Sequence, residues 1–238
     1  MSFYLTISIL SLLIAGGSIL FGATKAFRKT KENFPFRIFS LAFIFLGVQI
    51  TLVGIRHIFL GFSFFKIDIL LHYIGQAFFL APFFPLGTYF VSSLLIKENK
   101  FLKRGIDILV IFLCLLFIFF VLKEGVFSGE LKGPSYSSEW GTEYTLDPFS
   151  KKIMLCLVFF PYSLTIISLS REILRKVRKK GYNSLRFWSL FSISLLIFGA
   201  GDEFGLKDWQ LLICRGVYFL IGIIIYISFK KFYDRENL

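Results

Sequence analysis

The chain has 238 residues, of which 56% are hydrophobic and 33 are phenylalanine. This apolar content exceeds what one soluble core can bury, so it excludes an ordinary soluble domain and indicates a membrane protein. The formal net charge of +12 does not indicate nucleic-acid binding, because the basic residues lie in short clusters between long apolar runs.

Apolar runs of about the length that a membrane-spanning helix needs, roughly 20 residues, follow one another along the chain. They predict an all-α polytopic protein, a single domain of seven transmembrane helices. The seven runs are Phe3 to Ala23, Phe36 to Leu60, Ile67 to Ile96, Gly105 to Leu122, Ile153 to Leu169, Leu185 to Gly201 and Trp209 to Phe229. Pro82 and Pro85 lie inside the third run and offer no backbone N–H, so we expect a kink there.

Orientation follows from the basic residues, because loops rich in Lys and Arg stay in the cytosol. Most of the 27 Lys and Arg residues lie in the segments 25–37, 97–104, 171–186 and 230–235, which alternate with the other loops. This distribution predicts an N-terminus outside and a C-terminus in the cytosol. The stretch from Arg171 to Lys180 is suited either to anionic lipid or to a cytoplasmic signalling protein.

Ionisable and amide side chains inside the apolar runs are the best pointers to a site, because such groups are costly in a membrane and usually face the helix bundle. By the predicted topology they gather in the outer half. We therefore expect an outward-facing polar pocket between the second, third, sixth and seventh helices. The candidate ligand-binding residues are Gln49, Arg56, His57, His72, Gln76, Asp202, Glu203, Asp208 and Arg215.

Two interpretations of the arginines remain open. Arg56 and Arg215 can be neutralised within the protein, and by topology the nearest carboxylates singled out are Asp202, Glu203 and Asp208. Alternatively, one guanidinium binds a small anionic ligand, because its planar fork matches a carboxylate or a phosphate.

His57 and His72 flank a short external loop at similar depth, so paired ligation of haem or of a metal ion is a further hypothesis. A zinc hydrolase would need a third ligand and a positioned acid, for which Asp202, Glu203 and Asp208 have no suitable spacing. The three cysteines show no metal-ligand spacing. We therefore expect no catalytic residues, no metal and no cofactor.

Small residues indicate close helix contacts rather than chemistry. Gly17, Ser18 and Gly22 give the first helix a face of small side chains, and Gly216 with Gly222 does the same for the seventh.

The layout resembles the seven-helix membrane sensor region of some bacterial histidine kinases and diguanylate cyclases. The shared features are an external N-terminus, a long external loop after the fourth helix and a basic cytoplasmic loop after the fifth. The third helix adds to the likeness, with His72-Tyr73-Ile74-Gly75 leading to Pro82, Pro85 and Tyr89. Only Lys230 to Leu238 follow the last helix, so the resemblance implies output through a partner protein.

These observations favour a non-enzymatic, receptor-like or sensor-like protein of the cell (inner) membrane. It would bind a small, anionic ligand from outside and signal through a cytoplasmic partner. A small-solute transporter is the alternative, which predicts a polar path to the inner side. A membrane-embedded enzyme that uses the histidines and acids is the third hypothesis.

Overall fold

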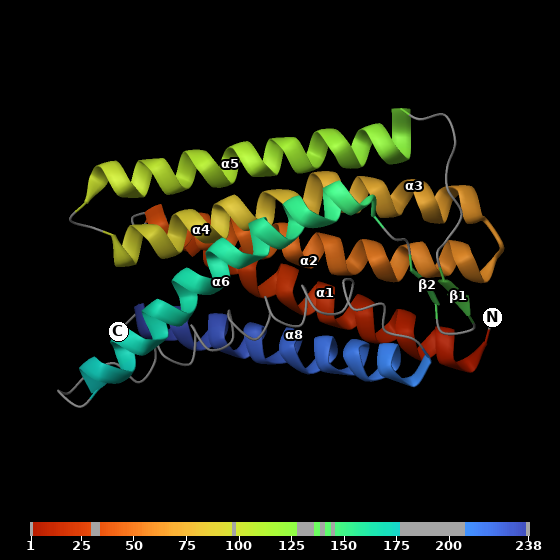
Figure 1. The fold of residues 1–238 in the computed structure, drawn as a ribbon. Helices are drawn as coiled ribbons and strands as arrows, with labels where there is room; N and C mark the ends of the chain where they lie inside the picture. Colours follow the sequence, from red (N-terminus) through yellow and green to blue (C-terminus); the bar gives the residue numbers. More distant parts are fainter. Residues whose placement is uncertain are drawn as a thin grey trace.

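The computed structural model describes residues 2–29, 34–96, 99–127, 136–138, 141–143, 146–176 and 208–236. Within these ranges the chain is helical apart from one small hairpin. Its helices lie mostly side by side, with α6 crossing the others obliquely (Figure 1). Helix α1 begins at one end of the bundle and α8 ends at the opposite end (Figure 1).

The first half of the chain forms the body of the bundle. It contains α1 (Phe3–Lys29), α2 (Phe34–Gly61), α3 (Phe65–Gly75), the π turn η1 (Gln76–Leu80) and α4 (Ala81–Leu95). Helix α2 ends where Ser63 adopts a left-handed φ of 63°. The Phe64 N–H then donates to the Phe59 carbonyl oxygen over 2.9 Å, which satisfies a terminal carbonyl and turns the chain back toward α3.

The second half adds helices against this body. Helix α5 (Lys100–Leu122) runs into the π turn η2 (Lys123–Phe127), and the strands β1 (Tyr136–Ser138) and β2 (Gly141–Glu143) pair antiparallel. Helices α6 (Pro148–Lys176) and α8 (Asp208–Glu236) follow.

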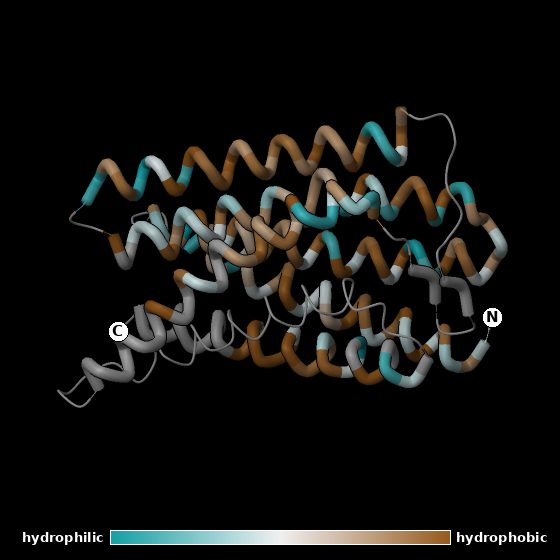
Figure 2. Tube along the Cα trace, viewed as in Figure 1, coloured by the Kyte–Doolittle hydropathy of each residue, from teal (hydrophilic) through white to brown (hydrophobic). Residues whose placement is uncertain are grey.

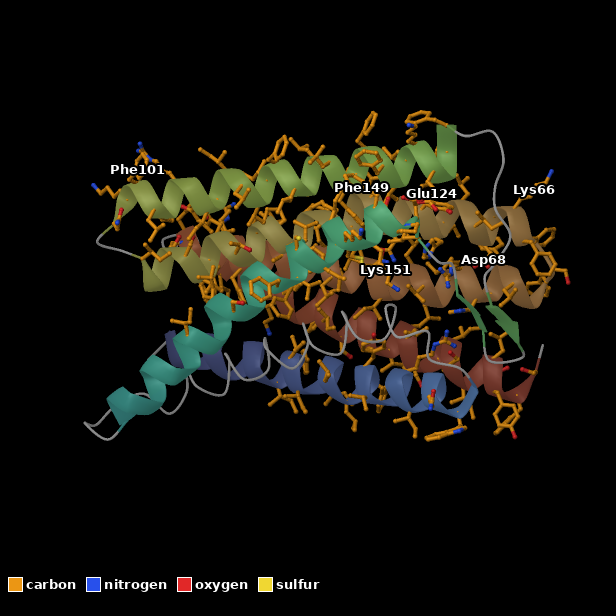
Figure 3. The ribbon with its side chains drawn as sticks, in the orientation of Figure 1. Lys66, Asp68, Phe101, Glu124, Phe149 and Lys151 are labelled. Atoms are coloured by element: carbon orange, nitrogen blue, oxygen red, sulfur yellow. The ribbon has the colours of Figure 1, made fainter. Side chains whose placement is uncertain are left out.

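Two polar side chains define the starts of α5 and α6. The side chain of Asn99 accepts from the Leu102 N–H over 2.9 Å, and that of Asp147 accepts from the Phe149 N–H over 3.0 Å. Both are N-cap contacts. Glu124 also accepts from the Asp147 N–H, so the end of α5 is tied to the start of α6, as the neighbouring Glu124 and Phe149 show (Figure 3).

Four helical segments are long and apolar enough to cross a membrane, namely Phe3–Lys29, Phe34–Gly61, Phe65–Ser93 and Lys100–Phe127. They confirm the first four predicted apolar helices to within a few residues. Hydrophobic residues run along nearly all of α5, with hydrophilic residues at its two ends (Figure 2). Many are exposed, including Ile108, Phe112 and Leu115, and such a face is suited to lipid tails.

The other three predicted helices are not among these four segments. Helices α6 and α8, each of 29 residues, contain the predicted fifth and seventh runs and extend beyond them. Within α8, Arg215–Ile227 is a shorter apolar helical stretch. The predicted sixth helix, Leu185 to Gly201, lies outside the described residues.

The interruption expected from the prolines takes the form of the π turn. The N–H of Ala81 donates to the carbonyl of Gln76, five residues earlier, and Pro82 follows directly. A proline removes one helical donor and crowds the turn before it, so a locally wider turn at this point relieves both effects.

Aromatic rings from α2 and α4 pack together inside the bundle. The ring of Phe39 lies 4.3 Å from that of Phe90 and 4.7 Å from that of Phe43, measured between centroids, and Phe43 meets Phe83 edge to face. All four side chains are buried. These rings form a buried aromatic layer between α2 and α4.

Helix α1 packs against α2 and α8 at small residues. A Cβ on Gly16 would lie 2.2 Å from Thr51 Oγ1, and one on Gly222 would lie 2.8 Å from the Cα of Ala15. Gly222 therefore confirms a predicted contact. Gly17 and Gly216 meet no described atom within 4 Å, so the described structure gives no support to their predicted packing roles. On α1 the contact lies at Gly16, one residue earlier.

Candidate functional site

A buried ion pair joins α2 to α3 at the end of the bundle where α1 begins. The Nε of Arg56 lies 3.0 Å from Oδ1 of Asp68, and Asp68 lies on α3 beside α2 (Figure 3). The Arg56 side chain is 5% exposed and that of Asp68 is 0% exposed. Desolvation is costly for both buried ions, and their mutual attraction offsets this cost, whereas either ion alone would lack that compensation.

His72 completes this part of the site. Its Nδ1 lies 2.5 Å from Nη1 of Arg56. Asp68 and His72 are four residues apart on α3, so they share the helix face that meets α2. Arg56 thus binds two side chains of one helix, as the fork of a guanidinium permits.

A second group of contacts joins α2 to α8 and α1. Nη2 of Arg215 lies 3.2 Å from Nε2 of His57. The other terminal nitrogen of Arg215 donates to Oγ of Ser8 on α1. All three side chains are buried, so α1, α2 and α8 meet through polar contacts at the same end of the bundle as the Arg56 pair.

The chemistry of arginine fixes the role of each histidine. A guanidinium carries only donors, so Nδ1 of His72 and Nε2 of His57 accept these hydrogen bonds. Neither of these two nitrogens therefore carries a proton. Arg56 and His57 are consecutive on α2, yet Arg56 contacts α3 whereas His57 contacts α8. Helix α2 therefore lies at the centre of a polar network that involves four helices. We call these six residues the outer cluster, after the side of the membrane expected from the sequence: Ser8, Arg56, His57, Asp68, His72 and Arg215.

Two amide side chains lie deeper in the bundle. Gln49 and Gln76 are 4% and 2% exposed, and within the described part of the chain the Oε1 atom of each accepts no hydrogen bond. Oε1 of Gln49 packs against Gly75, where an added Cβ would lie only 2.5 Å away. Gln49 therefore contacts the facing helix directly beside Gln76.

The structure brings together six of the nine predicted site residues at this end of the bundle: Gln49, Arg56, His57, His72, Gln76 and Arg215. Asp202 and Glu203 lie outside the described residues. Asp208 is the first residue of α8, and its side chain also lies outside what is described. The predicted pocket included the sixth and seventh helices but not the first, whereas Ser8 makes α1 part of the observed network.

Arg56 meets a carboxylate that the sequence analysis did not single out, Asp68. The predicted partners Asp202, Glu203 and the side chain of Asp208 lie outside the described residues. The sequence carried a signal for this, because Asp68 precedes His72 by four residues inside the same apolar run. Ser8 had no comparable signal, since a serine in an apolar helix usually bonds to its own backbone.

The histidines take separate partners in the structure, His72 with Arg56 and His57 with Arg215. Among the described residues there is no group of three His, Cys, Asp or Glu side chains that could hold a metal ion. The contacts of both histidines are thus those of a hydrogen-bonded network between helices.

A smaller polar group lies between α4 and α5, toward the other end of the bundle. Ser92 on α4 donates to Oδ1 of Asp107 on α5 over 2.9 Å, and the Lys103 ammonium lies 4.2 Å from the centre of the Tyr89 ring. Thr88 is completely buried one turn before Ser92. Among the described residues, the carboxylate of Asp107 and the hydroxyls of Ser92 and Thr88 thus lie toward this end of the bundle.

The outer cluster combines two guanidinium groups with two imidazoles. Its guanidinium groups recognise carboxylate or phosphate oxygens, and its imidazoles accept or relay a proton. Comparisons with protein-family models, with curated proteins and with solved structures find no match for this chain.

Proposed function

We propose that the chain crosses the cell membrane seven times, with its N-terminus outside and its C-terminus in the cytosol. Four apolar helices are present in the described structure, and α6, α8 and the apolar run from Leu185 to Gly201 supply three more crossings. The basic segments then all fall on the cytosolic side, as the positive-inside rule requires. The outer cluster lies in the outer half of the membrane in this topology.

Cysteine labelling tests the topology directly. In a background without Cys114, Cys156 and Cys214, we expect Phe62→Cys to react with an impermeant maleimide on intact cells. We expect Lys100→Cys to react only after the membrane is permeabilised. Phe62 is 68% exposed in the turn between α2 and α3, and Lys100 is exposed at the start of α5. The reverse pattern contradicts the orientation.

In this membrane we propose a receptor-like or sensor-like role, in which a small anionic ligand binds at the outer cluster. The observation that carries the proposal is that Arg56 and Arg215, both buried, connect α1, α2, α3 and α8 through side-chain contacts. An anion that competes with Asp68 for a guanidinium would change which helices are held together. Different affinity for two helix arrangements is the physical requirement for signalling.

Output would leave through the cytosolic face, where the basic stretch from Arg171 to Lys180 begins in the last turns of α6. A cluster of Lys and Arg beside a membrane helix attracts anionic lipid and equally an acidic protein surface. The resemblance to membrane sensor regions supports a protein partner, since in those proteins the seven-helix part controls a separate output domain.

An anion panel tests the ligand proposal. We expect one of acetate, succinate and inorganic phosphate to raise the melting temperature of the purified chain in nanodiscs, relative to chloride at constant sodium and ionic strength. Arg56→Lys and Arg215→Lys keep the charge but lose the planar fork, so at least one should lose the shift. Arg104→Lys, at an exposed arginine, is the matched control.

The ligand proposal fails if no anion shifts the melting temperature, or if both lysine variants respond like the wild type. A transporter remains the second candidate, because the Ser92–Asp107 contact places polar groups toward the other end of the bundle. Counterflow of the labelled anion in proteoliposomes would favour that candidate, whereas binding without flux favours the receptor.

A further inference from the structure

Gln49 and Gln76 combine deep burial with unsatisfied acceptors. The Oε1 atoms of both accept no hydrogen bond within the described residues, although both side chains are more than nine-tenths buried. A buried amide oxygen without a donor costs about 1–3 kcal/mol. Two such oxygens on facing helices indicate that a group outside the described residues supplies the donor or the positive charge.

By helix periodicity, Gln49 lies on the side of α2 that faces α3, and Gln76 lies on the side of the α3–η1 segment that faces α2. Asp68, His72 and Gln76 follow at intervals of four residues and form one stripe toward α2. On α2, Arg56 meets the first two members of that stripe. Gln49, seven residues earlier on the same face, packs against Gly75, the neighbour of Gln76.

The backbone near this point adds further oxygens. Gln76 begins the π turn, and Pro82 and Pro85 follow within α4. Neither proline has an N–H, so a carbonyl one turn before each lacks its usual helical donor. Interrupted membrane helices with such carbonyls and nearby side-chain oxygens favour monovalent cations in other membrane proteins.

We propose that Gln49 and Gln76, together with carbonyl oxygens of the adjoining π turn, bind a small monocation. Its source is either an alkali metal ion or the ammonium head of a small amine, since both are satisfied by neutral oxygen atoms. The proposal rests on the proposed function, because both glutamines belong to the candidate ligand-binding residues in the outer half of the membrane.

The surrounding charges permit a cation at this depth. Arg56 is the nearest cation on α2, but seven residues of helix separate it from Gln49, about 10 Å along the axis. Its charge is offset by Asp68 at 3.0 Å. A monocation between the glutamines would therefore lie next to a compensated ion pair rather than next to a bare guanidinium.

The test compares four chloride salts at equal ionic strength on the full chain in nanodiscs: sodium, potassium, methylammonium and N-methyl-D-glucamine. We expect sodium, potassium or methylammonium to raise the melting temperature by a few degrees in a saturable manner, while the bulky N-methyl-D-glucamine does not. A response to methylammonium alone identifies the amine source, and a response to sodium or potassium identifies the metal ion.

Gln49→Met and Gln76→Met preserve side-chain length without the oxygen, and they should fold because they remove an unsatisfied group. We expect each to melt at one temperature in all four salts. Ser40→Ala is the control, since Ser40 is buried and already donates to the Phe36 carbonyl, and it should keep the cation response.

Two results overturn the proposal. Equal melting of the wild type in all four salts means that the glutamines hold water only, and a cation response that persists in both methionine variants places the cation elsewhere. Neither result touches the anion response tested through Arg56 and Arg215, so the receptor proposal stands or fails separately.

Discussion

Replacing Asp68 with Asn lowers the free energy of unfolding by about 3–5 kcal/mol, the usual cost of leaving a buried ion without its partner. Asp68 is fully buried and its Oδ1 lies 3.0 Å from Arg56, so the substitution leaves the arginine charge uncompensated in a low-dielectric bundle. The measurement is an SDS unfolding titration in mixed micelles. Arg56→Leu should be similarly destabilised, because it leaves Asp68 charged and alone.

The double variant Arg56→Leu with Asp68→Leu separates the ion pair from simple loss of polarity. Replacing both ions with apolar residues removes the desolvation cost on each side, so we expect it to be more stable than either single variant. Arg104→Leu, at an exposed position, should change stability by less than about 0.5 kcal/mol. Additive losses in the double variant would contradict a direct Arg56–Asp68 contact.

Gly16→Ala destabilises the protein by about 1–3 kcal/mol, the usual range for overpacking a tight contact. Its Cβ would lie 2.2 Å from Thr51 Oγ1, 2.7 Å from the Thr51 nitrogen and 2.9 Å from the Gly47 carbonyl oxygen. Two of these atoms belong to the backbone of α2, so α1 and α2 would have to separate. Unfolding titration measures the loss.

The neighbouring glycine supplies the matched control. A Cβ on Gly17 meets nothing within 4 Å, so Gly17→Ala should be neutral or stabilising by up to about 1 kcal/mol, the helix-propensity difference between the two residues. The same contrast should hold on α8 between Gly222→Ala and Gly216→Ala. Equal effects at Gly16 and Gly17 would contradict the observed packing of α1 on α2.

Much of the fold is predictable because the membrane imposes it. Continuous apolar runs in lipid have to form helices, since no other single segment satisfies its backbone there. The first four apolar helices follow from this constraint alone. The proline-containing segment was also predictable as an interruption, but only the structure shows that it becomes a π turn beginning at Gln76.

The partners within the site were less predictable, because sequence spacing shows which residues share a helix face but not which helix lies opposite. Arg56 and His57 are adjacent in sequence and contact different helices. Asp68 lies near the beginning of the third apolar run, where an acidic residue also fits a solvent-exposed helix start. Gly16 and Gly17 look alike in sequence, and only the position of Thr51 on α2 distinguishes them.

The outer cluster is expected to act as one network through α2. A double-mutant cycle between Asp68→Asn and Ser8→Ala measures this coupling, because Asp68 contacts Arg56 while Ser8 contacts Arg215. If α2 couples the two sets of contacts, the cycle should give an interaction free energy of at least about 0.5 kcal/mol in unfolding titrations. Losses that add to within about 0.3 kcal/mol would mean two independent contacts and would contradict a single network.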